Sequence, residues 1–374
     1  MGVDAGAGVT NNLLGLGDIF NSRGTVVMDF TKISVAGMMM QGFAEGGLFF
    51  NVNTGPLSFG LFAGVETSGR FRASDALLRF LKEGNDQFRT LEGVLGFGGS
   101  VFLETGIRAG FPIKRLRINA GLALFSPLIY MPPPEISYRI DTSGPGGELV
   151  LSAIQMNIYS AASLEEGGFS LPDKNIPLGI PLGLDLQVEA VYSLLPKLNL
   201  GMEIDHIPIL PVRLRRLMRV YADGVNYRLD EMFGFLSGGG FNLPDYPDMK
   251  TVHSEDEHFW VVRPLFVDFF VEYRPAGTGL FVIRPLIGFS LPLAPGQSQV
   301  RLSAGLEGQI NIRKGFSLSL STAYREQIWQ QAVSLMFNLR VVELYTRLSL
   351  RGHDFVGSFN DKGLGVSAGL RFGY

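Results

Sequence analysis

The side chains in this sequence that could bind a metal ion or take part in hydrolysis gather in one acidic segment. His253 and His258 flank residues 254–257, which contain three carboxylates. Imidazole and carboxylate ligands suit divalent cations, and Ser254 beside His258 could supply a nucleophile and a base. A charge run in a polar loop is more often simply solvated, and no nucleophile-elbow pattern is present. We therefore predict no catalytic residue, no metal site, no cofactor and no enzyme activity.

Arginines and carboxylates also recur at alternate positions in many apolar segments. The candidates for solute binding are Arg108, Arg115, Arg117, Arg284, Arg301, Glu307, Arg347, Asp268 and Glu272. Facing rows of opposite charge inside a pore create a transverse field that selects polar solutes. The alternative is that these charges pair across neighbouring strands and fill a closed interior.

Strands must position these charges, because side chains in a strand alternate between two faces. In residues 300–313, valine, leucine, alanine and isoleucine alternate with arginine, glutamate and small or polar residues. The same alternation is found in residues 115–124, 184–192, 198–205, 267–273, 316–320 and 342–350. Segments of about ten alternating residues are typical of transmembrane β-barrels. On this pattern His206 ends a strand on its lipid face, and His353 begins an outer loop.

Composition agrees with a sheet that faces lipid. Of the 374 residues, 46% are hydrophobic and only 18% are charged, and 48 are glycine, whereas soluble domains carry about 25% charged residues. No uncharged apolar run is suited to a spanning helix, because Pro127 and residues 132–134 interrupt the longest one. A closed antiparallel sheet is the other structure that pairs every backbone group in lipid. The absence of cysteine excludes disulfides and thiolate metal sites.

Short turn signals and long polar connections interleave along the chain, as in barrels with short periplasmic turns and long outer loops. Counting back from Tyr374 gives up to eighteen strands if residues 136–141 and 225–230 are included. We predict an all-β transmembrane barrel of about sixteen strands, with fourteen to eighteen allowed. Residues 1–32 are expected to form a periplasmic or plug segment, and residues 33–374 the barrel. No secretory signal is visible, so we expect that a signal peptide has been removed.

The last residues, GLGVSAGLRFGY, alternate to the end of the sequence. We expect Leu370, Phe372 and Tyr374 on the lipid face and Arg371 in the lumen. A final strand with a terminal aromatic residue resembles the signal by which the barrel-assembly machinery recognises outer-membrane proteins. An exposed strand edge can bind such a partner by β-augmentation.

The whole chain resembles outer-membrane barrels of the porin and long-chain fatty-acid transporter type, including uncharacterised spirochaete and Bacteroidetes relatives. The Asn-Pro-Ala signature of the fatty-acid transporters is absent. The resemblance implies an integral protein of the bacterial outer membrane. It also implies a small-molecule or fatty-acid-like solute.

Three functions remain open from the sequence. The first is a channel or transporter that passes small or hydrophobic solutes through the barrel lumen. The second is a surface adhesin or structural barrel that works through its long outer loops, and the third is a barrel-embedded hydrolase. The expected partners are the lipid bilayer, the assembly machinery and lipopolysaccharide, which the basic cluster around Arg213 and Arg219 could contact. Nucleic acid is not an expected partner.

Overall fold

The structure is a computed structural model of the chain. It describes residues 1–11, 37–55, 57–76, 90–132, 135–141, 143, 148–152, 154–160, 164–165, 168–169, 181–214, 217–222, 224–228, 250–254, 258–275, 279–292, 300–312, 315–325, 327–339, 341–359 and 362–373. Within these residues, no helix is both long and apolar enough to cross a membrane.

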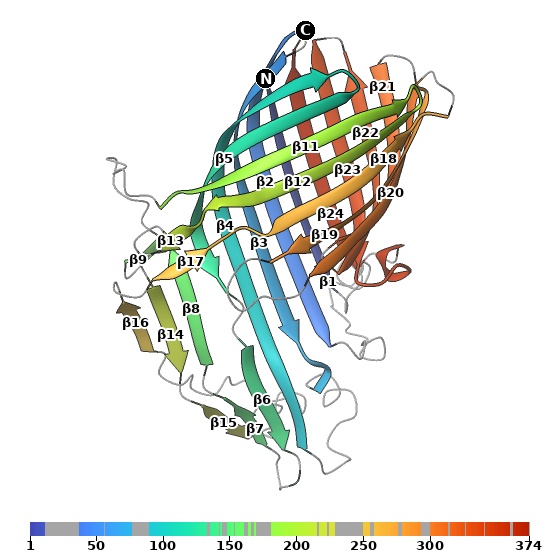
Figure 1. The fold of residues 1–374 in the computed structure, drawn as a ribbon. Coiled ribbons are helices and arrows are strands. Elements are labelled where there is room, and N and C mark those ends of the chain that lie inside the picture. The colour runs from blue at the N-terminus through green and yellow to red at the C-terminus, as the bar shows by residue number, and fades with distance from the viewer. Residues whose placement is uncertain are drawn as a thin grey trace.

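The described strands form a closed antiparallel barrel of fourteen strands (Figure 1). They are β1 (Gly2–Asn11), β2 (Met38–Thr54), β3 (Leu57–Ala73), β4 (Thr90–Ile113), β5 (Leu116–Met131), β11 (Gly183–Leu195), β12 (Leu198–Leu210), β18 (Leu265–Tyr273), β19 (Phe281–Leu291), β20 (Arg301–Ile312), β21 (Phe316–Arg325), β22 (Ile328–Asn338), β23 (Val342–Gly352) and β24 (Gly363–Phe372). Each strand pairs with the next of this series, and β24 pairs with β1, as in Val3 opposite Leu370. The predicted barrel is confirmed, with a strand count at the lower end of the expected range.

Alternation separates an apolar outer face from a polar inner face. On β20, Leu302 is 67% exposed and Leu306 is also exposed, whereas Ser303 between them is buried. The inner face is identified by contacts that skip a strand, because only the concave side of a curved sheet brings such side chains together. Arg347 on β23 reaches over β22 to donate a hydrogen bond to Ser321 Oγ on β21 at 3.4 Å. The outer face therefore suits lipid, and the charged residues face the lumen.

The two ends of the barrel differ in their connections. At the end that holds both chain termini, which we call the turn end, strands are joined by short turns (Figure 1). Lys114 adopts a φ of 55° in the turn between β4 and β5. The opposite end, the loop end, carries most of the long connections, although Gln327 makes a tight turn there between β21 and β22. This arrangement matches the predicted interleaving of turns and loops.

The N-terminal residues correct the expected domain boundary. We expected residues 1–32 to lie outside the barrel wall, but β1 pairs with both β2 and β24 over its length. Val3 and Val9 on its outer face are exposed, and they alternate with glycine, aspartate and threonine. This alternation is hard to recognise in the sequence, because glycine and alanine occupy many positions on both faces of the strand. Residues 12–36, where a plug was predicted, lie outside the described residues.

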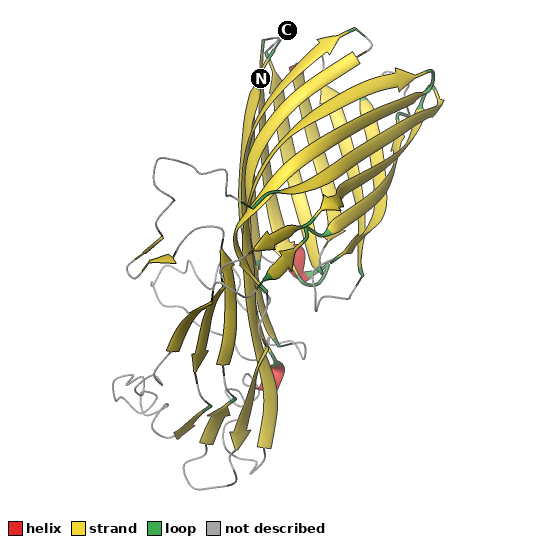
Figure 2. Ribbon diagram, turned by 60° about the vertical axis from the view of Figure 1, so that its left-hand side comes forward, coloured by secondary structure: helices red, strands yellow, loops and turns green. Residues whose placement is uncertain are grey.

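The sheet continues beyond the loop end as an extension (Figure 2). Its strands are β6 (Glu135–Asp141), β7 (Glu148–Leu151), β8 (Ile154–Ser160), β14 (Leu217–Ala222), β15 (Val225–Arg228) and β16 (Lys250–Ser254). Strand β4 pairs with β5 in the barrel and with β6 in the extension, and the end of β5 pairs with β8. Two segments counted as possible barrel strands, residues 136–141 and 225–230, thus contribute β6 and β15 to the extension. Period-two alternation does not distinguish a wall strand from one that continues past the membrane.

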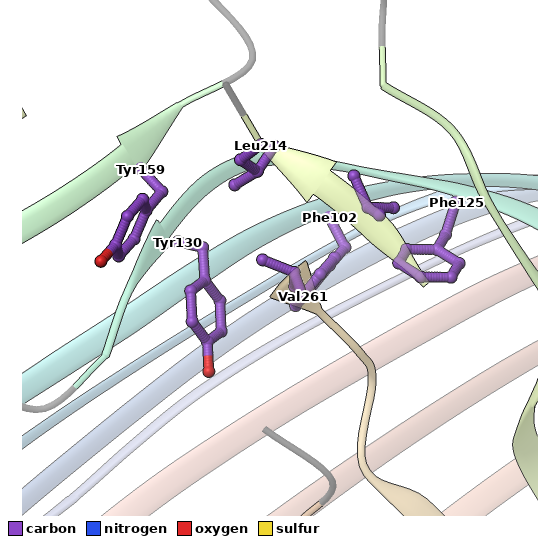
Figure 3. Packing of buried hydrophobic residues seen from close by; sticks show 7 residues of the cluster. Phe102, Phe125, Tyr130, Tyr159, Leu214 and Val261 are labelled. Atoms are coloured by element: carbon purple, nitrogen blue, oxygen red, sulfur yellow. The ribbon is translucent and has the colours of Figure 1, made fainter. Parts of the chain in front are cut away.

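The remaining elements are short. They are the pair β9 (Leu164–Glu165) and β10 (Gly168–Phe169), the pair β13 (Val212–Leu214) and β17 (Phe259–Val261), and the 3-10 helix η4 (Gly357–Phe359). The pair β13 and β17 packs on the barrel wall through Val212, Leu214 and Val261, all of which are at most 1% exposed. These side chains join Phe102, Phe125, Tyr130 and Tyr159 in a buried cluster at the loop end (Figure 3).

Candidate functional site in the barrel interior

A bulge interrupts the pairing of β12 with β11 near the loop end. Leu186 pairs with Ile207 and Val188 pairs with Ile204, so two residues of β12 lie opposite one residue of β11. His206, one of the two, adopts a φ of 59°. Its Nδ1 lies 3.1 Å from the Pro264 carbonyl oxygen. The predicted lipid-facing position of His206 is wrong, because an extra residue in a bulge shifts the alternation that follows it.

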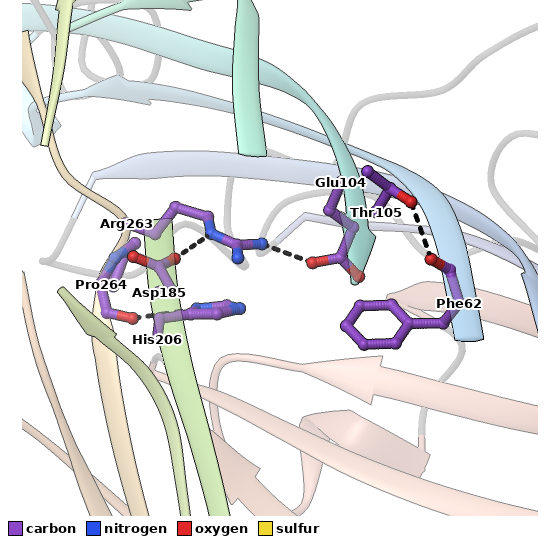
Figure 4. A network of polar contacts seen from close by, with 7 residues as sticks. All are labelled: Phe62, Glu104, Thr105, Asp185, His206, Arg263 and Pro264. Atoms are coloured by element: carbon purple, nitrogen blue, oxygen red, sulfur yellow. Dashed lines mark hydrogen bonds and ion pairs between the residues drawn. The ribbon is translucent and has the colours of Figure 1, made fainter. Parts of the chain in front are cut away.

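Arg263, just before β18, is the centre of a buried ion network (Figure 4). Its Nε and Nη1 donate to Asp185 Oδ2 and Glu104 Oε2, each at 2.6 Å. Asp185 and Arg263 are 0% and 2% exposed. The guanidinium also lies over the ring of Phe125, 4.8 Å from its centroid. One arginine therefore fastens the segment before β18 to β11 and β4 across the inside of the barrel.

An aromatic stack covers this network from the loop end. Phe259 on β17 stacks on Tyr159 at 4.1 Å and on Tyr130 at 5.6 Å between ring centroids. Phe102 packs edge-on to Phe125 at 6.1 Å. Burying these rings and the aliphatic residues of β13 stabilises the inward position of β13 and β17 by the hydrophobic effect.

Phenylalanine rings lie flat on the inner wall over glycines of the neighbouring strand. In five direct cross-strand pairs, a Cβ on the glycine would lie only 2.1–2.5 Å from a ring carbon of its partner, so only glycine leaves room for the ring. The pairs are Gly2 with Phe49, Gly8 with Phe43, Gly106 with Phe62, Gly183 with Phe125 and Gly201 with Phe270. An arginine covers each ring, respectively Arg371, Arg351, Arg108, Arg263 and Arg284. Phe62, Phe125 and Phe270 are buried beneath their arginines, while Phe43 and Phe49 stay partly exposed, so the lumen meets arginines and only part of the ring surface.

A row of carboxylates crosses three strands midway along the interior. Glu189 on β11 is opposite Glu203 on β12, and Glu203 is opposite Asp268 on β18. Asp268 accepts a hydrogen bond from Ser303 Oγ at 2.9 Å and lies 3.7 Å from Arg325 Nη2. Like charges in register repel each other, and the polar partners reduce that cost.

A cavity of about 320 Å³ opens on the inner wall at the turn end. Cationic side chains dominate its lining, with Arg115, Arg117 and Arg284 joined by Lys114 and Arg274. The carboxylates among its lining residues are Glu189 and Glu272. Val191 and Leu116 add a smaller apolar area. The cavity can therefore hold a small molecule against several positive charges.

The structure brings four of the nine predicted solute-binding residues together in this cavity, namely Arg115, Arg117, Arg284 and Glu272. The other five are spread over the inner wall. Arg108 covers Phe62, Asp268 is in the carboxylate row, and Arg347 contacts Ser321. Arg301 begins β20 opposite Ser290, and Glu307 is opposite Arg284. Solute binding by any of these residues stays a prediction.

The terminal strand lies as its pattern predicts. Arg371 Nη1 donates to Glu343 Oε1 at 2.9 Å, and its guanidinium covers Phe49 on the inner wall. Phe372 is exposed on the outer face. Tyr374 lies outside the described residues, and recognition of this strand by an assembly partner stays a prediction.

Sequence reasoning missed the central role of Arg263 and the cavity residues Lys114 and Arg274. Arg263 lies between two apolar strands and precedes a proline, which marks a break in the strand. Its partner Glu104 is 159 residues away along the chain, and no local pattern predicts such a pairing. Lys114 and Arg274 flank turn signals, which made them look like solvated turn residues.

The acidic segment of residues 253–258 is only partly described. Residues 250–254 form β16, which pairs with β14 in the extension. Residues 255–257 and the side chain of His253 lie outside the described residues. Among the residues whose side chains are described, no group of three or more histidine and carboxylate ligands is placed to hold a metal ion.

Comparison with known proteins identifies the fold. No protein-family profile and no curated protein sequence matches the chain. Among solved structures, the toluene transporter TodX of P. putida is 9% identical with a TM-score of 0.50, over 99% of this chain and 88% of that one. The toluene transporter TbuX of Ralstonia pickettii is 9% identical with a TM-score of 0.47, over 100% and 89% of the two chains. A FadL homologue of Pseudomonas aeruginosa is 11% identical with a TM-score of 0.41, over 99% and 87%. The likeness to TodX supports a shared fold, that of an integral outer-membrane β-barrel.

Proposed function

We propose that this chain is an outer-membrane channel or transporter that carries small solutes with an apolar or aromatic body through its lumen. The observation that carries the proposal is the inner wall, where phenylalanine rings and arginines line a closed barrel whose outer face is apolar. The partly exposed rings of Phe43 and Phe49 offer a solute apolar surface beside the charge of the arginines. The fold shared with a toluene transporter supports the same class of function.

Transport can be tested with the purified full-length chain in liposomes. Proteoliposomes should take up small aromatic solutes such as labelled benzoate faster than protein-free liposomes of the same lipid. Planar bilayers should show single-channel conductance after the protein inserts. Failure to take up any solute of a panel of aromatic acids and sugars, together with no conductance, would contradict the proposal.

A surface role is the second candidate, because the sheet extends beyond the loop end through β6, β7, β8, β14, β15 and β16. Such an extension could present a binding surface outside the cell. An adhesin needs no path through its lumen, so liposome uptake separates the two functions. Uptake with wild-type protein favours transport, whereas its absence combined with binding of whole cells to a host matrix favours the surface role.

A further inference from the structure

The turn-end cavity carries more positive charge than the groups around it neutralise. Five cations and two carboxylates are among its lining residues. Glu272 is already engaged, since it accepts hydrogen bonds from Arg274 Nη2 at 2.6 Å and from Asn199 Nδ2 at 3.2 Å. Glu189 accepts a hydrogen bond from the side-chain amide of Asn119. Outside the lining, Glu307 lies opposite Arg284 on β20, and Glu203 interacts with the charge of Arg284. Among the described groups, the surplus of positive charge therefore lies mainly at Lys114, Arg115 and Arg117.

The remaining cations are free to bind a ligand. Within the part of the chain that the structure describes, Lys114, Arg115, Arg117 and Arg284 form no ion pair. The Nε atom of Arg284 is buried and has no hydrogen-bond partner among the described groups. A ligand in the cavity cannot reach this shielded atom and would contact Arg284 through its terminal guanidinium nitrogens, which are not among the buried atoms that lack a partner.

The position of Arg284 is set by the inner wall. Its guanidinium lies over the ring of Phe270 at 4.0 Å from the centroid, and Phe270 in turn lies over Gly201. This stacking holds the guanidinium in place while its edge remains available for hydrogen bonds. A guanidinium can donate two parallel hydrogen bonds to the two oxygens of a carboxylate or phosphate group.

The size and the apolar wall of the cavity limit the ligand. A volume of about 320 Å³ is at the lower end of the range for small-molecule pockets, about 300–1,000 Å³, and accommodates a molecule with one ring or a short chain. Val191 and Leu116 supply apolar surface beside the cations, whereas the ring of Phe270 is only 6% exposed and lies beneath Arg284. A neutral hydrocarbon would leave those cations without acceptors, and an inorganic ion would leave the apolar wall uncovered.

We propose that the turn-end cavity binds a small organic anion, an apolar body of about one ring that carries a carboxylate or phosphate group. Arg115, Arg117 and Arg284 hold the oxyanion, and Val191 and Leu116 contact the apolar body. The inference rests on the proposed function, because it names the class of solute that the lumen carries. Arginine-lined constrictions favour anions in other pores.

Calorimetric titration of the full-length protein in detergent micelles tests the site without requiring transport. The ligands are benzoate, its neutral analogue benzyl alcohol, and inorganic phosphate. The test variant is Arg115→Gln/Arg117→Gln, and the control is Arg139→Gln, which removes one exposed charge from β6 in the extension. Loss of two charge-assisted contacts should weaken benzoate binding by about tenfold or more, whereas the control should bind benzoate like the wild type. Benzyl alcohol should bind much more weakly than benzoate.

Several results would overturn the assignment. Equal benzoate binding by the double variant and the wild type would exclude the arginines, and benzyl alcohol binding as tight as benzoate would exclude an anion site. Binding of inorganic phosphate without binding of benzoate would exclude the apolar body. Arginine-dependent benzoate binding without liposome uptake would contradict only the transport proposal. Uptake that is insensitive to the double substitution would contradict only the site.

Discussion

The two ends of the barrel interior use the same residue types for opposite purposes. At the loop end, Arg263 is buried between Asp185 and Glu104 with both contacts at 2.6 Å. At the turn end, Arg115 and Arg117 are exposed to the lumen and form no ion pair among the described residues. A paired and buried arginine holds chain segments together, whereas an unpaired arginine beside a cavity can bind a ligand. Pairing and burial, rather than charge, distinguish structure from binding in this lumen.

The largest effect of a single substitution is expected at the buried network. Arg263→Met leaves Asp185 buried without its cation, and breaking a buried pair in this way costs about 3–5 kcal/mol. Urea unfolding in micelles, followed by fluorescence of the nearby Trp260, measures the change. The double variant Asp185→Leu/Arg263→Met should recover much of the loss, because no uncompensated charge remains. Unchanged stability of Arg263→Met would remove the distinction between the two ends.

The regular strands were the predictable part of the molecule. Alternation in β20 and β24 assigned Leu302 to lipid and Arg371 to the lumen because period two needs no knowledge of the partner strands. The same argument placed Arg115, Arg117 and Arg284 on the inner face, so much of the candidate site was visible in the sequence. Whether those arginines would be paired was not visible, because pairing depends on neighbours across the barrel.

The loop end was less predictable for two physical reasons. A bulge changes the face of every residue after it. The sequence marks this one only by a change of phase, because the apolar positions move from Ile204 to Ile207 across two consecutive polar residues. The ion network joins Arg263 to residues on β11 and β4, which become neighbours only after the barrel closes. The extension strands carry the same alternation as wall strands, which raised the expected strand count.

A smaller loss of stability is expected from disrupting the packing of a phenylalanine ring on a glycine, which occurs at both ends of the barrel. Gly201→Val places a side chain against Phe270, since even a Cβ would lie 2.1 Å from a ring carbon. Overpacking of this kind costs about 1–3 kcal/mol. The displaced ring would also release Arg284, so benzoate affinity should fall together with stability. Gly308→Val, a change on the outer face of β20 where a Cβ meets nothing within 4 Å, is the control, and equal behaviour of the two variants would contradict the stacking role.

A pH effect should arise at the loop end, where His353 follows β23. Burial is the main cause that lowers the pKa of His353 below its usual value of 6.5, and Arg70 and Lys362 lower it further. The unfolded chain therefore binds the proton more readily than the folded protein, so stability should fall as the pH drops through 6.5. Unfolding midpoints between pH 8 and pH 5 measure this effect. His353→Gln should lose stability less steeply than the wild type, and parallel pH profiles would show that this group does not contribute.

The smallest effect on stability is expected from the arginines that line the turn-end cavity. Arg117 is exposed and forms no ion pair among the described residues, and exposed charges contribute about 0–1 kcal/mol. Arg117→Gln should therefore unfold within about 0.5 kcal/mol of the wild type, while its affinity for benzoate decreases. The urea and calorimetric measurements together give both values. A large loss of stability in Arg117→Gln would mean that the turn-end arginines hold the barrel together as Arg263 does, and the cavity would then be a structural feature rather than a binding site.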